Sequence, residues 1–127
     1  MKFRDDVPIY RQISRYISGE IISGRIHAGT KIPSVRQLAL QFSVNTNTVQ
    51  RALREMIAAQ ILKPRRGKGN FVTTDTAAIA GLREMMVERA VLAMYQRLHA
   101  LNINDESIKA YIDNFLRKRS SEDGKSD

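Results

Sequence analysis

The chain has 127 residues and a formal net charge of +8, with 43% hydrophobic and 27% charged residues. These proportions are ordinary for a soluble globular protein of one medium domain, or of one small domain with an appendage. No segment approaches the roughly 20 uncharged apolar residues that span a bilayer, and no apolar stretch follows the charged N-terminus as in a secretory signal. The absence of cysteine excludes disulfides, thiolate zinc sites and cysteine nucleophiles. We therefore expect a cytoplasmic protein with no membrane partner.

The positive charge is confined to the first part of the chain. Residues 1–75 hold 13 Lys and Arg against 5 Asp and Glu, which leaves all of the net +8, whereas residues 76–127 hold 8 of each kind. Between Lys31 and Thr74 there are eight basic residues and one acid, Glu55. A merely solubilising surface would mix the two signs, so the distribution favours a polyanionic partner for the basic part.

The first predicted helix begins at Pro8, a residue that suits a first helical turn, and Gly24 can cap its end. Its apolar residues recur at helix spacing and are Ile9, Ile13, Tyr16, Ile17, Ile21 and Ile22. Residues 25–33 follow as a connector with turn signals at Gly29 and Pro33.

Two helices separated by a tight break come next. Ser34 can N-cap a helix that runs to about Phe42, and Asn45 can N-cap another that runs from Thr46 to about Ala59. The second of these carries an amphipathic stripe, formed by Val49, Ala52, Leu53, Met56 and Ile57.

A β-hairpin is expected at about residues 61–73. Residues 60–63 and 70–73 have the pattern of short strands, and a basic turn with Gly67 and Gly69 joins them. Two helices, a tight turn and a hairpin follow one another in the order of a winged helix-turn-helix. We predict this domain at residues 7–75, with the helix-turn-helix at about 34–59.

Residues 76–119 are predicted to form two further helices, with a break at Asn102. Asn104 can N-cap the last helix, whose first turn carries Asp105 and Glu106, as the helix dipole favours. Residues 120–127 are polar and expected to be a disordered tail. The predicted fold class is therefore mostly α with a small β-hairpin wing: a winged helix-turn-helix followed by a two-helix C-terminal dimerisation segment.

The helix from Thr46 to Ala59 is the candidate for reading DNA. Its polar side chains fall on one face opposite Met56, and they are Asn47, Gln50, Arg51 and Arg54. Asn and Gln can bond adenine bidentately, Arg can bond guanine or phosphate, and Thr46 can reach a base edge or a thymine methyl. A merely solvated face usually mixes Glu with Lys, whereas here Glu55 lies only at the margin. The DNA-reading interpretation is therefore favoured.

Two further clusters are candidates for contacts with the DNA backbone. Ser34 and Arg36 begin a helix whose N-terminal amides suit a phosphate, although spacing alone leaves Arg36 equally open to being a plain surface arginine. The hairpin tip gathers cations and glycines, namely Lys63, Arg65, Arg66, Gly67, Lys68 and Gly69. Basic side chains there would neutralise phosphates, and Arg66 would fit a narrow minor groove.

Catalysis and metal binding have few candidate residues. The two histidines, His27 and His99, have no second ligand at metal spacing, and phosphate-loop and dinucleotide fingerprints are missing. We expect no enzyme activity, no metal and no cofactor.

The motifs in residues 7–75 resemble the GntR superfamily of bacterial transcription regulators. The matching segments are Pro8–Ile13, Ser23–Ile26, Gly29–Ala39, Val44–Leu53 and Arg65–Val72. The resemblance implies base or phosphate contacts from Arg36, Thr46, Asn47 and Gln50 and from the wing residues Arg66 and Gly67. Ala28 stands where the family usually has proline. Gln60 stands where it usually has glycine, at the exit of the third helix.

The C-terminal part resembles the YtrA-like subfamily, whose members carry only two short helices there and are often associated with control of ABC-transporter genes. The resemblance implies a homodimer joined through those helices. The need to bury apolar surface gives the same expectation. A long and a short amphipathic helix, about 50 residues in total, cannot bury both of their apolar stripes without the winged domain or a second chain. The predicted dimerisation residues are Leu82, Met86, Ala90, Met94, Leu98, Ile108, Ile112 and Phe115.

The leading hypothesis is a homodimeric, sequence-specific transcription regulator, a repressor rather than an activator, that binds an inverted-repeat operator in double-stranded DNA. An architectural protein that coats DNA without sequence preference is the alternative, and the amide-rich face argues against it. An enzyme or a membrane-surface adaptor ranks third. A small-molecule effector stays open. The two-helix part is too small to enclose a typical pocket of about 300–1,000 Å³, so a ligand would bind at the dimer interface or between that part and the winged domain.

Overall fold

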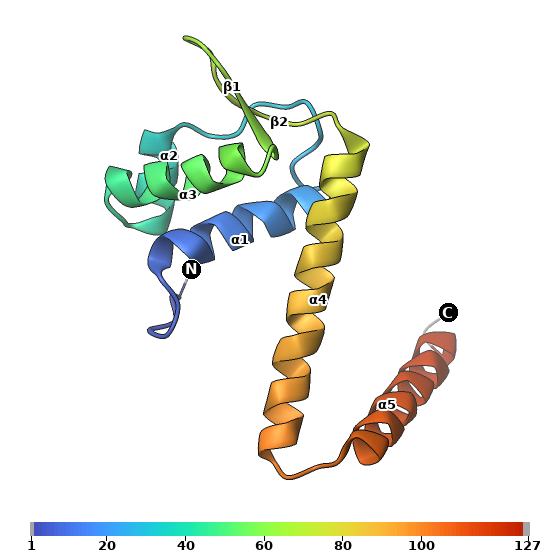
Figure 1. The fold of residues 1–127 in the computed structure, drawn as a ribbon. Coiled ribbons are helices and arrows are strands. Elements are labelled where there is room, and N and C mark those ends of the chain that lie inside the picture. Colours follow the sequence, from blue (N-terminus) through green and yellow to red (C-terminus); the bar gives the residue numbers. More distant parts are fainter. Residues whose placement is uncertain (1, 126–127) are drawn as a thin grey trace. The chain divides into compact units, whose positions relative to one another are not determined.

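The computed structural model describes residues 2–125, with side chains as far as Glu122. The elements over these residues are α1 (Ile9–Ile22), α2 (Val35–Phe42), α3 (Thr46–Ala58), β1 (Leu62–Arg65), β2 (Gly69–Val72), α4 (Thr76–Ala100) and α5 (Asp105–Lys125) (Figure 1). This order confirms the predicted fold class. The chain divides into two compact units, the first ending at Glu84 and the second beginning at Met85.

The core of the first unit forms where α1, α2 and α3 pack together. The predicted stripe of α3 supplies Val49 and Ala52, both 0% exposed, and α1 supplies Ile13, also 0% exposed. Each helix buries one face because its apolar residues return every three or four positions. The other buried apolar residues of these helices are Ile17, Ile21, Leu38, Ala39, Phe42, Leu53 and Met56.

Local hydrogen bonds fix the first turns of α2 and α3. Ser34 and Gln37 form a capping box at the start of α2, and the Asn45 side chain accepts from the backbone N–H of Asn47 at the start of α3. Ser43 reverses the chain with φ 56° and ψ 49°. Both predicted N-caps are therefore confirmed, and they fix where each helix begins.

The wing is an antiparallel hairpin in which Leu62 pairs with Val72 and Arg65 pairs with Gly69. The predicted basic turn is shorter than expected, because Pro64 continues β1. Proline is tolerated there since the other edge of this strand is free. The connector also docks on β2. Ile32 donates its N–H to the Asn70 carbonyl at 3.0 Å, and Val72 donates to the Thr30 carbonyl at 2.9 Å.

The turn after α3 contains a residue with a left-handed backbone conformation. Gln60 has φ 66°, a conformation in which a Cβ atom crowds the following carbonyl and which glycine adopts without that cost. The exit turn is nonetheless closed, because Ile61 donates its N–H to the Met56 carbonyl at 3.0 Å. The geometry gives a physical reason for the family's preference for glycine at this position.

In the second unit, α5 leaves the end of α4 at an angle instead of lying along it (Figure 1). The predicted break is confirmed, since Asn102 has φ 66°. The Asn104 side chain caps α5 by accepting from the N–H of Ser107 at 2.8 Å. The Tyr95 hydroxyl donates to Asp105 Oδ1 at 3.0 Å, and this bond to the carboxylate raises the pKa of Tyr95.

The prediction of a disordered tail from residue 120 is wrong for its first part, because α5 continues to Lys125. Residues 120–122 contain neither proline nor glycine, and Glu122 lies one helical turn after Lys118, a spacing that favours an ion pair on a helix. Residues 126–127 lie outside the described residues.

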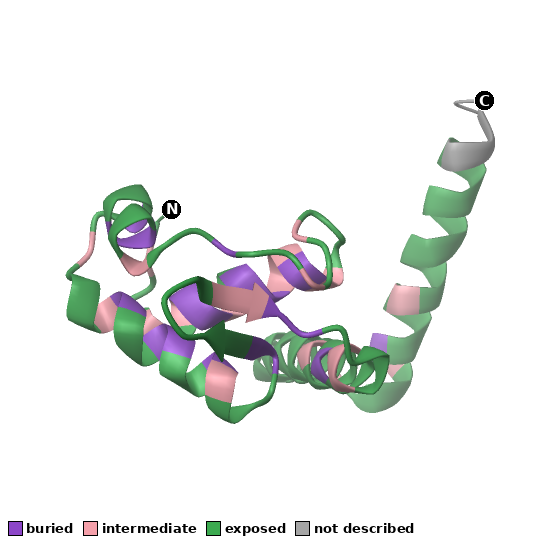
Figure 2. Cartoon of the chain, turned by 90° about the horizontal axis from the view of Figure 1, so that it is seen from above, coloured by how far each residue is buried: buried purple, intermediate pink, exposed green. Residues whose placement is uncertain are grey.

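The predicted dimerisation residues differ in exposure. Leu82 is 7% exposed and belongs to the first unit, and Ile108 is 6% exposed. The half-buried members are Met86, Leu98 and Ile112, and the exposed ones are Ala90, Met94 and Phe115. Figure 2 shows that α5 is exposed along most of its length.

Candidate nucleic-acid interface

The polar face of α3 is open to solvent. All five of its predicted contact residues are exposed, namely Thr46, Asn47, Gln50, Arg51 and Arg54. The opposite face forms the core, so the helix separates a buried side from a polar one. Among the described residues, the side chains of Asn47 and Gln50 have no hydrogen-bond partner. Their donors and acceptors are therefore available for the edges of bases.

Arg51 is held by an aromatic ring of another helix. Its guanidinium carbon lies 4.1 Å from the centroid of the Tyr10 ring in α1, a cation–π distance. The N–H groups of a guanidinium point outward in its own plane, so stacking on the ring leaves them free for other partners. The side chain is thus directed toward the first turn of α1.

Ser34 and Arg36 are both exposed at the start of α2. The Ser34 oxygen accepts from the N–H of Gln37 at 3.1 Å, and the Gln37 amide oxygen accepts from the N–H of Ser34 at 2.8 Å. Because the Ser34 oxygen acts as an acceptor in this box, its own O–H stays available to donate to a phosphate. The box also fixes the first turn from which Arg36 projects.

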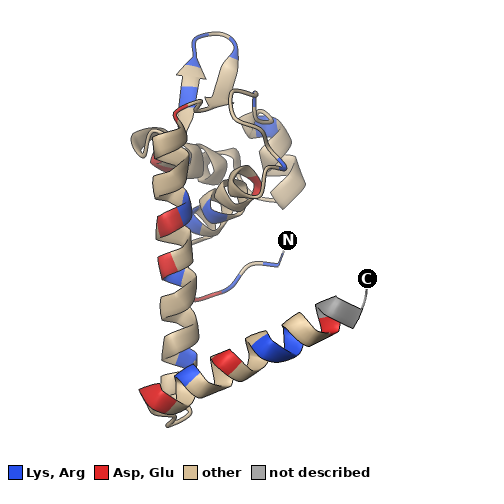
Figure 3. Ribbon diagram, turned by 90° about the vertical axis from the view of Figure 1, so that its right-hand side faces the viewer, with Lys and Arg blue, Asp and Glu red and all other residues tan. Residues whose placement is uncertain are grey.

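The tip of the wing consists of cations around a left-handed glycine. Arg66, Gly67 and Lys68 are exposed, and Gly67 has φ 75°. Lys68 closes the turn by donating its N–H to the Arg65 carbonyl at 2.9 Å. The guanidinium of Arg65 lies over the Phe71 ring at 4.3 Å. Figure 3 shows Lys and Arg at this tip with no acidic residue beside them.

Two residues that sequence reasoning missed lie beside this surface. Lys31 runs along the wing so closely that a Cβ atom on Gly69 would lie 2.8 Å from Lys31 Cε. Asn70 lines a surface hollow of about 290 Å³ together with Gln50 and Arg54. The connector's pairing with β2 brings Lys31 there. The sequence signal, an extended stretch before Pro33, was too short to predict that pairing.

The described residues hold no set of His, Asp and Glu side chains arranged to bind a metal ion. In the same part of the chain, no helix combines the length and the apolar character needed to cross a membrane.

The N-capped helix α2 is followed by α3, whose exposed face is polar and poor in acids, and then by the cationic hairpin of β1 and β2. This order and these surfaces define a winged-helix DNA-binding protein. The sequence profile described as "Bacterial regulatory proteins, gntR family" matches residues 9–72. A "GntR family transcriptional regulator from Listeria monocytogenes" has a similar solved structure, with a TM-score of 0.78, 37% sequence identity, and coverage of 88% of this chain and 98% of that one. The chain belongs to the GntR family and is a DNA-binding transcription regulator.

Two other similar proteins bear on the site. The "HTH-type transcriptional repressor YtrA" of Bacillus subtilis is 33% identical over 88 residues, which cover 68% of each chain. This match confirms the resemblance to YtrA. The solved structure "Crystal Structure of AraR(DBD) in complex with operator ORE1" has a TM-score of 0.52 at 30% identity. It covers 57% of this chain and 90% of that one.

Proposed function

We propose that the chain is a homodimeric repressor that recognises an inverted-repeat operator. The observation that carries the proposal is the face of α3, where the unpaired amides of Asn47 and Gln50 are exposed and no acid lies among them. Two such helices related by a two-fold axis would read half-sites about one helical turn apart, roughly 34 Å, or a multiple of it. The protein would act in the cytoplasm.

Base reading is assigned to Asn47 and Gln50, with Thr46 at the first turn. Their exposure and lack of partners support this role, because amides pair bidentately with adenine. The remaining predicted contacts are assigned to phosphates and the minor groove, where cations supply affinity without sequence information. These residues are Ser34, Arg36, Arg51, Arg54, Arg65, Arg66, Gly67 and Lys68, and we add Lys31 because it lies along the wing.

The homodimer is supported by apolar surface in the second unit. Val91 is 54% exposed, Leu92 53% and Phe115 59%, although large hydrophobic side chains on a monomer's surface usually occur singly. The other large exposed hydrophobic residues of this unit are Met85, Val87, Met94, Tyr95, Leu101, Tyr111 and Leu116. Those on α4 lie on several sides of that helix, as in helices covered by more than one neighbour. A second copy, joined through α4 and α5, is the proposed cover.

Repression is proposed because the relative YtrA is a repressor by its printed name. The operator complex of the AraR DNA-binding domain supports operator binding by a domain of this fold.

The test is a selection of bound fragments from the source genome, followed by competition gel shifts of the best fragment against random DNA. We expect an inverted repeat among the bound sequences and a preference for it of at least about a thousandfold. A reporter gene placed behind that sequence should lose expression when the protein is present. Equal binding to all fragments would overturn sequence-specific recognition, and raised reporter expression would overturn repression.

A further inference from the structure

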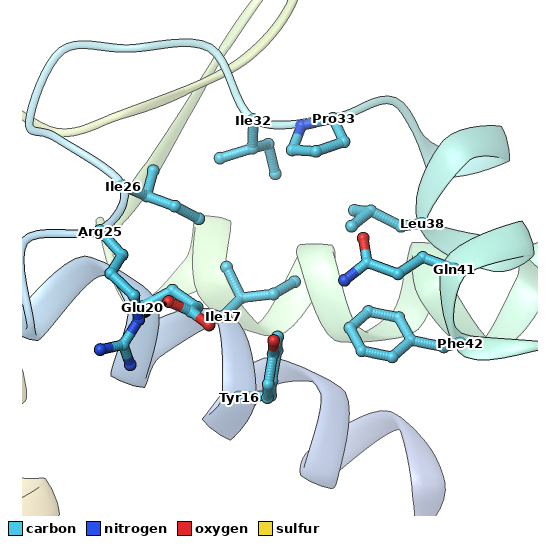
Figure 4. A pocket seen from close by; sticks show the side chains of 10 residues that line it. All are labelled: Tyr16, Ile17, Glu20, Arg25, Ile26, Ile32, Pro33, Leu38, Gln41 and Phe42. Atoms are coloured by element: carbon cyan, nitrogen blue, oxygen red, sulfur yellow. Dashed lines mark hydrogen bonds and ion pairs between the residues drawn. The ribbon is translucent and has the colours of Figure 1, made fainter. Parts of the chain in front are cut away.

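The first unit contains a cavity that the DNA-binding face does not use. It has a volume of about 170 Å³ and lies between α1, the connector and α2. Figure 4 shows Ile17 and Tyr16 on one side of it, Leu38 and Phe42 on another, and Ile32 across from them. All of its lining residues belong to the first unit.

The walls of this cavity are apolar. Ile32 is 2% exposed, Ile17 and Leu38 are each 3% exposed and Phe42 is 5% exposed, so the surface that they present is that of a core. The Tyr16 and Phe42 rings meet edge to face, with centroids 5.5 Å apart and an interplanar angle of 85°. An aromatic guest extends such an arrangement favourably. A cavity of about 150 Å³ lined by Leu, Ile and Phe is large enough to hold benzene, so the volume here suits one ring.

The polar part of the rim carries a neutralised pair of charges. Arg25 Nε donates to Glu20 Oε2, and this bond above all holds the pKa of Glu20 below its ordinary value. Because the carboxylate is paired with a guanidinium, neither an anion nor a cation in the cavity gains a net attraction. The rim therefore favours a neutral guest.

The Tyr16 hydroxyl is engaged by a hydrogen bond with Glu20, which raises the pKa of Tyr16. Gln41 supplies the other polar group of the lining. Figure 4 shows its side-chain amide directed into the space between Ile17 and Leu38. Within the part of the chain that the structure describes, this amide has no hydrogen-bond partner. An amide can both donate and accept, so it matches one hydroxyl or amide group on a guest.

We infer that this cavity binds a neutral single-ring aromatic molecule with one hydroxyl or amide group, its ring against Phe42 and Tyr16 and its polar group on Gln41. Such a guest would touch α2, the helix that begins at Ser34 and carries Arg36. The inference does not depend on DNA binding or on dimerisation.

The test is a titration of the full-length chain with benzyl alcohol, followed by amide chemical shifts in ¹H–¹⁵N NMR. We expect saturable shifts confined to the backbone around Ile17, Ile32 and Leu38–Phe42, and a rise in the thermal midpoint with ligand concentration. Benzoate, which has the same ring and a charge, should bind at least about tenfold more weakly. Shifts that do not saturate, shifts that spread to the second unit, or benzoate binding as tightly as benzyl alcohol would overturn the inference.

Two variants test the geometry. Gln41→Trp should fill the cavity and abolish the shifts, whereas Leu40→Trp is a matched control, because Leu40 is 77% exposed on the same helix and does not line the cavity. Gln41→Leu keeps the cavity but removes the amide. It should weaken benzyl alcohol binding about fivefold and leave toluene binding unchanged. Unchanged benzyl alcohol binding in both Gln41 variants would also overturn the inference. None of these experiments contains DNA, so a negative result would not bear on the proposed DNA-binding function.

Discussion

Replacing Gln60 by glycine should make the first unit more stable. Gln60 has φ 66° at the exit of α3, and a left-handed backbone costs a residue with a Cβ atom about 1–2 kcal/mol. Glycine removes that cost but brings about 0.5–1 kcal/mol of additional freedom in the unfolded chain. The change also removes an exposed hydrogen bond from Lys63 Nζ to the Gln60 side chain, worth a few tenths of a kcal/mol.

The net gain expected for Gln60→Gly is therefore about 0.5 kcal/mol, with about 1 kcal/mol as the upper limit. For a unit of this size, a gain of 0.5–1 kcal/mol raises the midpoint of thermal unfolding by roughly 2–6 °C. The measurement is thermal and urea unfolding of the full chain at one fixed protein concentration, since dimerisation would shift the midpoint. DNA affinity should stay unchanged, because Gln60 does not belong to the proposed interface.

The neighbouring residue provides the control. Ala59 has φ −81°, so glycine brings no relief there, and Ala59→Gly should lose about 0.5–1 kcal/mol. Gln60→Ala keeps a Cβ atom and should gain nothing. The reasoning is refuted if Gln60→Gly is no more stable than the parent chain, or if Ala59→Gly stabilises as much.

Four other substitutions test the interface, the dimer and a helix cap. Gln50→Ala should cost about 1–3 kcal/mol on the operator and relax specificity in competition gel shifts; an unchanged preference over random DNA would rule out base reading. Lys68→Ala should weaken all DNA alike and reduce the slope of log affinity against log salt by about 1, whereas a loss restricted to the operator would contradict a phosphate contact. Phe115→Asp should shift the protein toward monomers in sedimentation, and an unchanged dimer would exclude Phe115 from the interface. Ser34→Ala should cost about 1 kcal/mol in urea unfolding through loss of the cap, and unchanged stability would show that the capping box contributes little.

The local features of the fold were predictable from the sequence. Ser34, Asn45 and Asn104 were each expected to cap a helix, and each side chain accepts a backbone N–H in the structure. Capping depends on a few neighbouring residues, so the signal is complete within a short window. The same holds for the stripe of α3, whose spacing identifies both the core face and the exposed polar face.

Features that depend on distant segments were not predictable. The connector joins β2 through the N–H of Ile32 and the carbonyl of Asn70, although its few extended residues show no alternation. The left-handed conformation of Gln60 was also hidden, because only the family's preference for glycine pointed to it. In α4 the expectation of one stripe missed Val87 and Val91, since a helix that is apolar on several sides has no single face to detect.

Two of the arginines that lie over aromatic rings connect the fold to the proposed contact with DNA. Arg51 lies over Tyr10 and Arg65 lies over Phe71, so α3 and the wing each hold one guanidinium against an aromatic ring of a different element. An arginine that is already positioned loses less side-chain freedom when it meets a phosphate, and so retains more of its binding free energy. In this way α1 and β2 can raise the affinity of the proposed DNA-binding surface. The free amides of Asn47 and Gln50 then remain available to contact the edges of the bases.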